Sequence, residues 1–386
     1  MLKTVSAPAR HTAAMRPALA MFRLLLVLVH ALWLATGPTP AVADEAVRGV
    51  WIAGPQHSRF WDSRATMRAE LKIMKRAGLN RVYAVALLQD RTLYPSARMA
   101  RLTGVRQLET LGQRDAFLEL LEEAGRLGIR VVAWLEPGFS SHVDGRETTG
   151  LLHEHPEWVA LGCDGRPVIK NGFHWMNAFD PAVQQLIIDL SVELLHRYPT
   201  LAGVQGDDRL PASPSSAGYH PALLKAFGWR AGEPLPAARD ARWIRFRANL
   251  LTDFLRRWRA AVKRERPGAV LSLAPSPYPW SLEEYLQDWP AWMRAGLVDE
   301  LIPQLYSRNA ARYEQLLRQT RAQIPADQMK RVFPGMLLAL GPDVIPSDAL
   351  LADWLSSTRR WGFLGEVQFH SIGVAPREAV FRAAYH

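Results

Sequence analysis

Cysteine is nearly absent from this sequence, which has a single residue of this type, Cys163, among 386 residues. An intrachain disulfide and a thiolate metal cluster are therefore excluded. The fold must be stabilised by a hydrophobic core instead. A chain of this length, with 48% hydrophobic residues, is long enough to bury one.

The sequence also lacks runs of lysine and arginine interleaved with aromatic residues, the pattern that is typical of a nucleic-acid groove. Its formal net charge is +10, and four of the cations lie before residue 44 with no acidic residue among them, so residues 44–386 carry +6. A mildly basic surface suits peripheral association with anionic envelope polymers or lipid headgroups, and it equally serves solubility. We expect no nucleic-acid partner.

Long hydrophobic runs are scarce as well. The one at 24–35, "LLLVLVHALWLA", is shorter than a typical membrane span. Basic residues precede it, and the helix-breaking "GPTP" and the small residues of "AVA" follow it, ending at Ala43. This is the pattern of a signal peptide with its cleavage site. We therefore expect residues 1–43 to be a signal peptide and the protein to be exported to the periplasm or secreted, with an uncleaved anchor as the alternative.

From residue 47 onward, short apolar runs alternate with amphipathic stretches. Eight apolar runs predict strands at 47–54, 81–88, 130–136, 201–207, 269–275, 300–306, 331–338 and 365–371. Helical periodicity predicts helices at 63–77, 113–127, 181–197, 242–265, 281–295, 309–323, 347–361 and 376–384. Eight such units in one unbroken series predict an α/β fold, a (β/α)8 TIM barrel in a single domain over 44–386.

The connections between these elements are asymmetric. Helix-to-strand turns are short and contain glycine, whereas long connections follow strands two, three and four, over roughly 89–112, 137–180 and 208–241. They emerge at the carboxyl ends of the strands, where barrels of this type have their active sites. We therefore expect the functional site under these three loops.

Carboxylates are scarce at the strand ends, where only Glu136, Asp207 and Asp208 occur. Side chains alternate along a strand, and Val204 suits the outer, helix-facing side, so Gln205 and Asp207 should point into the barrel. Asp208 is the first loop residue, and alternation does not decide its direction. A helix-capping role fits this pair poorly, because the next helix begins only at about residue 221 or later.

Two acids at neighbouring strand ends are what glycosidic bond hydrolysis requires. One acid stays protonated to donate a proton to the leaving oxygen, and the other is ionised as nucleophile or base. When two carboxyl groups lie close together, ionising the second beside the first is unfavourable, so their pKa values move apart. Adjacent strands lie about 4.8 Å apart, which admits either a retaining or an inverting pair. Asp207, Asp208 and Glu136 are therefore the candidate catalytic residues, with the roles left open.

Polar and aromatic residues share the inward direction at several strand ends, and buried polar groups are costly unless they serve a site. The inward pairs are Trp134 with Glu136, Gln304 with Tyr306, and Gln368 with His370. The long third loop contributes His174, Trp175 and Asn177. We expect sugar contacts from Trp134, Trp175, Asn177, Gln205, Gln304, Tyr306 and His370, with a structural role as the alternative for His370.

Four segments resemble the glycosyl-hydrolase-like family ten of bacterial proteins: "VRGVWIAG", "WLEPGF", "LIPQLYSR" and the block from Trp175 to Leu210. The resemblance covers nearly all of 44–386 and implies a TIM barrel that acts on an amino-sugar polysaccharide such as denuded peptidoglycan glycan strands. Asp207 and Asp208 match the paired acids of the family motif. The sequence departs from that motif at Ala202, where aspartate is usual, and at Gln205, where histidine is frequent.

The sequence therefore predicts an exported glycoside hydrolase that uses neither a cofactor nor a metal ion. One alternative is a barrel that binds glycan, or scaffolds envelope partners, without cleaving it. The other is a metal-dependent polysaccharide deacetylase that uses Asp207, Asp208 and histidines, with His153 and His155 as the candidate ligand pair. Residues two apart on a helix do not face one another, which disfavours that second alternative.

Overall fold

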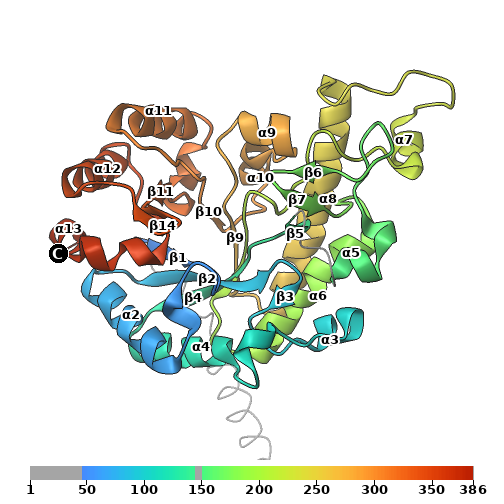
Figure 1. The fold of residues 1–386 in the computed structure, drawn as a ribbon. Coiled ribbons are helices and arrows are strands. Elements are labelled where there is room, and N and C mark those ends of the chain that lie inside the picture. The colour runs from blue at the N-terminus through green and yellow to red at the C-terminus, as the bar shows by residue number, and fades with distance from the viewer. Residues whose placement is uncertain (1–45, 144–149, 386) are drawn as a thin grey trace, which may run out of the picture. The chain divides into compact units, whose positions relative to one another are not determined.

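In the computed structural model, which describes residues 46–143 and 150–385, eight parallel strands form the centre of the fold (Figure 1). Their order in the sheet is β10 (Glu300–Leu301), β9 (Val270–Leu273), β8 (Gly203–Gly206), β4 (Arg130–Leu135), β2 (Arg81–Leu88), β1 (Arg48–Ile52), β14 (Glu366–Phe369) and β11 (Gly335–Leu337). Parallel bridges pair Leu301 with Val332 and Gln304 with Gly335. The two end strands therefore meet, and the predicted TIM barrel is confirmed.

Helices follow the strands in the predicted alternation and surround the sheet (Figure 1). They are α2 (Arg64–Arg76), α4 (Ala116–Arg126), α6 (Pro181–Arg197), α8 (Ala241–Glu265), α9 (Trp280–Tyr285), α10 (Trp289–Arg294), α11 (Ala310–Arg321), α12 (Asp348–Arg360) and α13 (Glu378–Tyr385). The single helix predicted at 281–295 is instead two, because Leu286 adopts a left-handed conformation and Asp288 caps the next helix. Within the described ranges, no helix is long and apolar enough to cross a membrane.

Polar side chains define where these helices begin. Ser63 accepts a hydrogen bond from the backbone N–H of Thr66 at the start of α2, and Asp115 does the same for Leu118 in α4. Asp180 caps α6, where Pro181 occupies the first helical position. Such caps satisfy N–H groups that have no partner within the helix, at about 0.5–2 kcal/mol each.

The barrel interior is filled by side chains that bond across it. Trp51 on β1 donates its indole N–H to the side-chain oxygen of Gln205 on β8 at 2.7 Å. At the opposite end of the strands, Tyr83 donates its hydroxyl to Glu300 at 2.9 Å, and Arg81 forms an ion pair with the same carboxylate. The interior is therefore a packed core that supports the carboxyl ends of the strands from below.

The predicted long connections after β2, β4 and β8 are confirmed, and each contains its own short elements. β3 (Arg91–Thr92) and α3 (Ala97–Thr103) follow β2. The connection after β4 contains β5 (Ser140–Val143), α5 (Leu151–Glu154), β6 (Ile169–Lys170) and β7 (Phe173–Trp175). α7 (Pro221–Phe227) follows β8, and the hairpin of β12 (Ala339–Leu340) and β13 (Asp343–Val344) follows β11. The expected signal peptide, 1–43, lies outside the described residues.

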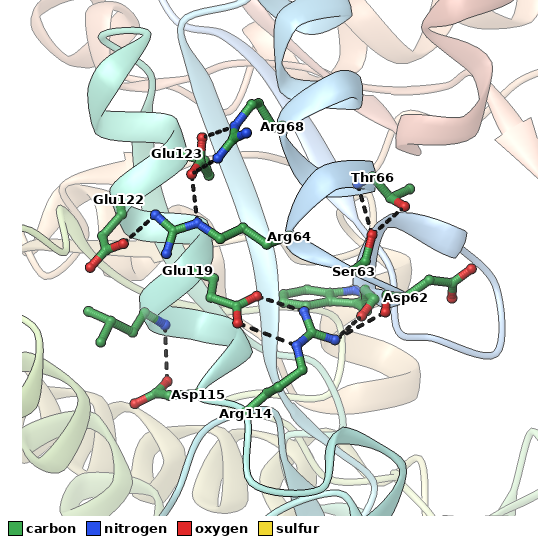
Figure 2. A network of polar contacts seen from close by, with 12 residues as sticks. Asp62, Ser63, Arg64, Thr66, Arg68, Arg114, Asp115, Glu119, Glu122 and Glu123 are labelled. Atoms are coloured by element: carbon green, nitrogen blue, oxygen red, sulfur yellow. Dashed lines mark hydrogen bonds and ion pairs between the residues drawn. The ribbon is translucent and has the colours of Figure 1, made fainter.

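An ion-pair network joins α2 to α4 on the outside of the barrel (Figure 2). Glu123 on α4 has a side chain only 2% exposed and pairs with Arg64 at 2.7 Å and Arg68 at 2.8 Å. Arg126 pairs with the same carboxylate from its own helix. The hydrogen bond from Arg68, together with those from the other two guanidinium groups, holds the pKa of Glu123 well below its usual value.

We expect Glu123→Gln to lower the free energy of unfolding at neutral pH by about 1–3 kcal/mol, because three cations lose a buried anionic partner. A depressed folded-state pKa stabilises the fold above the unfolded-state value of about 4.3, and that contribution is lost as the pH falls. The difference in the free energy of unfolding between variant and wild type should therefore shrink below about pH 4. Urea unfolding over a pH series measures it.

Glu122→Gln is the matched control, because Glu122 also pairs with Arg64 but has a side chain that is 44% exposed. It should cost roughly 0–1 kcal/mol. If Glu122→Gln and Glu123→Gln lowered the free energy of unfolding equally, burial would not explain the contribution of Glu123.

Candidate active site

A pocket of about 200 Å³ lies at the carboxyl end of the barrel, over the ends of β4 and β8. Its walls are Trp51, Trp134, Glu136, Lys170, Asn171, Phe173, Trp175, Asp207, Asp208, Arg209, Tyr285, Gln304, Tyr306 and Phe369. All three acids predicted from the sequence are among them. The structure also brings in Arg209, together with aromatic residues that the sequence analysis did not single out.

Asp207 is the most buried of the three acids. Its side chain is 3% exposed, against 20% for Glu136 and 34% for Asp208. It accepts hydrogen bonds from the indole N–H of Trp134 at 3.1 Å and from the backbone N–H of Arg209 at 3.0 Å. Burial, followed by the charge of Asp208, raises the pKa of Asp207 well above its usual value. Asp207 therefore holds a proton at pH values where an ordinary aspartate is ionised.

Arg209 lies between the three carboxylates. Its Nη2 forms an ion pair with Oε1 of Glu136 and lies 3.7 Å from Oδ2 of Asp207, while its Nε lies 3.8 Å from Oδ1 of Asp208. The guanidinium also lies over the ring of Phe173, 4.7 Å from its centroid. Burial lowers the pKa of Arg209, but the three acids outweigh it and raise the pKa above its usual value. The site therefore contains a permanent cation.

Glu136 and Asp208 differ in how firmly they are held. Glu136 accepts a hydrogen bond directly from Arg209. Asp208 lies 3.8 Å from the same guanidinium, a distance too long for a hydrogen bond. Its side chain is partly exposed in the pocket wall. Asp208 therefore turns back into the barrel mouth, the direction that strand alternation left open. Its oxygens are available to a ligand, whereas one oxygen of Glu136 is occupied.

Aromatic rings form much of the remaining wall. Trp51 packs 6.5 Å from Trp134, and Tyr306 packs 5.3 Å from Phe369, measured between ring centroids. Trp175 is buried by stacking 5.8 Å from Tyr285 and still borders the pocket. Burial, followed by the charges of Asp208 and Asp207, raises the pKa of the Tyr306 hydroxyl well above its usual value, so it remains a neutral donor. Such walls offer apolar faces with a few polar groups, which suits the alternating faces of a sugar ring.

Three residues predicted to contact substrate do not line the pocket. Gln205 is fully buried one layer deeper, where it accepts from Trp51 and donates to Ser272 at 2.9 Å, so it positions an indole ring. Asn177 uses its side-chain oxygen to accept from the backbone N–H of Phe179, which forms a turn before α6. His370 is 2% exposed, and burial together with His57 lowers its pKa to about 4. The side chains of Gln205 and Asn177 are therefore engaged in scaffold contacts, whereas that of His370 is buried against Phe369, 5.2 Å away between ring centroids.

Arg209 is the functional residue that sequence reasoning missed. It directly follows Asp207 and Asp208, and an arginine next to two acids in a loop is usually solvated, so its position alone carried no signal. A tight turn explains its burial, since the backbone N–H of Leu210 bonds to the carbonyl of Asp207 and folds the chain back. Within the described ranges, including this pocket, no group of three or more His, Cys, Asp and Glu residues is arranged to hold a metal ion.

The chain is similar to a known family in sequence and to solved structures in fold. The model of a family described as "Glycosyl hydrolase-like 10" matches residues 46–355. Among solved structures, the chain is similar to the PgaB (BpsB) glycoside hydrolase domain from Bordetella bronchiseptica, with a TM-score of 0.63 and 18% identity over 88% of this chain and 98% of that one. No curated protein sequence matches it.

Two further solved structures show the same fold at lower identity. α-L-Fucosidase isoenzyme 2 from Paenibacillus thiaminolyticus has a TM-score of 0.62 and 15% identity over 88% of this chain and 48% of that one. The catalytic domain of β-amylase from Paenibacillus polymyxa has a TM-score of 0.61 and 11% identity over 89% of this chain and 98% of that one. These likenesses support the barrel architecture and say nothing about substrate.

We expect Arg209→Met to lower the free energy of unfolding by about 3–5 kcal/mol at neutral pH, because it leaves three carboxylates together without their cation. Without the cation, the pKa of Asp207, which burial and Asp208 already raise, would rise further. A carboxyl group with a raised pKa destabilises the fold increasingly as the pH rises, so the deficit should be smaller at about pH 5 than at about pH 8. Urea unfolding at both pH values checks this.

Arg166→Met is the matched control. Arg166 belongs to the connection after β4, has a side chain that is 84% exposed, and lies 3.9 Å from its acidic neighbour, Asp164. Its replacement should leave stability unchanged at both pH values. If the loss of unfolding free energy in Arg209→Met is as large at about pH 5 as at about pH 8, Arg209 does not stabilise the fold by offsetting the charge of the acids.

Proposed function

The chain belongs to the glycosyl hydrolase-like 10 family, and we propose that it is a glycoside hydrolase that cleaves an amino-sugar polysaccharide such as denuded peptidoglycan glycan strands. The observation that carries the proposal is that Asp207 and the partly exposed Asp208 lie in one aromatic pocket. Burial, followed by the charge of Asp208, raises the pKa of Asp207. Hydrolysis of a glycosidic bond uses two carboxyl groups that flank the bond, one to donate a proton and the other to act as nucleophile or base.

In the proposed reaction, Asp207 is the general acid. The bond between the anomeric carbon and the glycosidic oxygen breaks, and the proton of Asp207 passes to the leaving oxygen. Asp208 assists on the carbon side, either by taking a proton from the attacking water or by bonding first to the anomeric carbon. One water is consumed in either case, and its hydroxyl group ends on the anomeric carbon.

Glu136 and Arg209 act as positioning residues in this proposal. The charge of Arg209 opposes the rise in the pKa of Asp207, so that the proton is held but can still be transferred. Glu136 anchors the guanidinium from the neighbouring strand end. In this proposal Asp208, and not Glu136, has the part next to the sugar, a choice that the sequence left open.

The substrate and the location rest on further observations. The aromatic walls of the pocket support a carbohydrate ligand, and the sequence resemblance supports an amino-sugar polymer. The N-terminal pattern of 1–43 and the basic charge support export to the periplasm or the exterior, with peripheral association with anionic envelope polymers. The solved PgaB domain, to which the chain is similar in fold, is itself a glycoside hydrolase domain.

We expect Asp207→Asn and Asp208→Asn each to lower kcat by about 10²–10⁴-fold while the protein still folds, because each loses a reacting group. Reducing ends released from denuded glycan strands and from chitooligosaccharides measure the activity. Asp164→Asn, with a side chain that is 59% exposed in the loop after β4, is the matched control and should keep full activity. A wild-type protein that binds these glycans and never cleaves them would instead indicate a glycan-binding barrel.

Glu136→Gln should retain far more activity than Asp208→Asn and should shift the pH profile. The charge of Glu136 raises the pKa of Asp207, so its removal lowers that pKa. The reaction needs Asp207 protonated, and activity is lost as the pH rises through its pKa. The alkaline limb of kcat/KM should therefore move to lower pH. If the alkaline limb does not move, or if activity falls as far as in Asp208→Asn, Glu136 takes part in the reaction itself.

A further inference from the structure

The pocket around the acids continues into a groove on one side. It shares walls with a neighbouring hollow of about 510 Å³, namely Trp134, Glu136, Phe173 and Phe369. That hollow in turn shares Gln56, Leu88 and Gln89 with a third one of about 480 Å³, which ends at Trp61 and Arg114. The groove therefore runs from the acids across the ends of β14, β1 and β2, with room for a chain of several sugars.

A bridge between two loops forms another part of the pocket wall. Nζ of Lys170, from β6, forms an ion pair with Oε2 of Glu284 in α9 at 2.8 Å and donates to its backbone carbonyl at 3.1 Å. The same Nζ lies 4.4 Å from the centroid of the Tyr285 ring. Asn171 adds a hydrogen bond of 2.7 Å to the Tyr285 hydroxyl. We call these four residues the 170–285 bridge.

The position of the bridge follows from the order of the strands. β4, β8 and β9 are consecutive in the sheet, and the bridge joins the connection after β4 to the one after β9. It therefore passes across the end of β8, where Asp207 and Asp208 lie. Lys170, Asn171 and Tyr285 belong to the pocket wall and to neither of the two hollows that form the groove, so the bridge borders the pocket where the groove does not.

We propose that the 170–285 bridge ends the substrate cleft and makes the protein a chain-end hydrolase. The terminal sugar occupies the pocket between the bridge and the acids, and the rest of the polymer lies in the groove toward Gln56 and Gln89. The pocket, at about 200 Å³, is smaller than the roughly 300–1,000 Å³ of sites for drug-sized ligands, which fits a single terminal sugar. This inference rests on the proposed hydrolase function.

Two consequences follow for the products. Cleavage next to a closed end releases short products one after another, so the long polymer shortens slowly while small sugars accumulate from the start. Contacts along the groove bind only the longer substrates, so kcat/KM should rise with chain length until the groove is filled. A cleft open at both ends would instead cut the polymer at internal bonds and produce fragments of mixed length early.

The test uses chitooligosaccharides of defined length and denuded glycan strands labelled at one end, with products separated by size at low conversion. Wild-type protein should release short sugars from one end of the chain. Lys170→Ala/Asn171→Ala, which removes the bridge contacts, should produce internal fragments early. If this double variant unfolds, Lys170→Met replaces it, because its side chain can still cover the Tyr285 ring without the ion pair.

Arg239→Ala is the matched control, since Arg239 pairs with Glu284 from the solvent side, has a side chain that is 69% exposed, and does not line the pocket. Its products should match those of wild type. Internal fragments from wild type, or bridge variants that still release only short end products, would overturn the inference. Both outcomes keep the proposed function, because reducing ends still form. A complete absence of new reducing ends with every substrate would instead contradict the function.

Discussion

Three carboxyl groups can occupy one pocket of this barrel because the guanidinium of Arg209 lies between them. Ionising a carboxylate beside another is unfavourable in a site with little water, and a cation at hydrogen-bonding distance offsets that cost. Arg209 does so unequally, since it bonds directly to Glu136 and reaches Asp207 and Asp208 only at 3.7 and 3.8 Å. This inequality leaves Asp207 with its raised pKa and Asp208 with free oxygens. The proposed chemistry depends on both.

The scaffold places these groups by burying a polar layer beneath them. Gln205 bonds to both Trp51 and Ser272, so strands β1, β8 and β9 are tied together just below the acids. Trp51 and Trp134 then form the floor and wall of the pocket, and Trp134 donates to Asp207. Each of these bonds satisfies a group that would otherwise be buried without a partner, which is costly inside a protein. The same contacts that stabilise the barrel therefore orient the proposed acid.

The connections at the carboxyl ends of the strands decide what reaches this layer. The connection after β2 lines the far part of the groove, and those after β4 and β9 meet at the 170–285 bridge. The framework of strands and helices is common to hydrolases of different specificities, such as the fucosidase and amylase to which the chain is similar in fold. Differences in substrate and in cleavage pattern among such barrels must arise in these connections.

The sequence by itself determined the barrel, the eight strands, most helix boundaries and the inward direction of Asp207. These features depend on local periodicity and on capping residues, which a linear sequence records directly. Only the tertiary structure decided the place of Arg209, the different situations of Glu136 and Asp208, the scaffold contacts of Asn177 and Gln205, and the burial of His370. It also decided the bridge between Lys170 and Glu284, which are 114 residues apart. Such contacts join side chains from different strands and loops, so their geometry exists only after the barrel has closed.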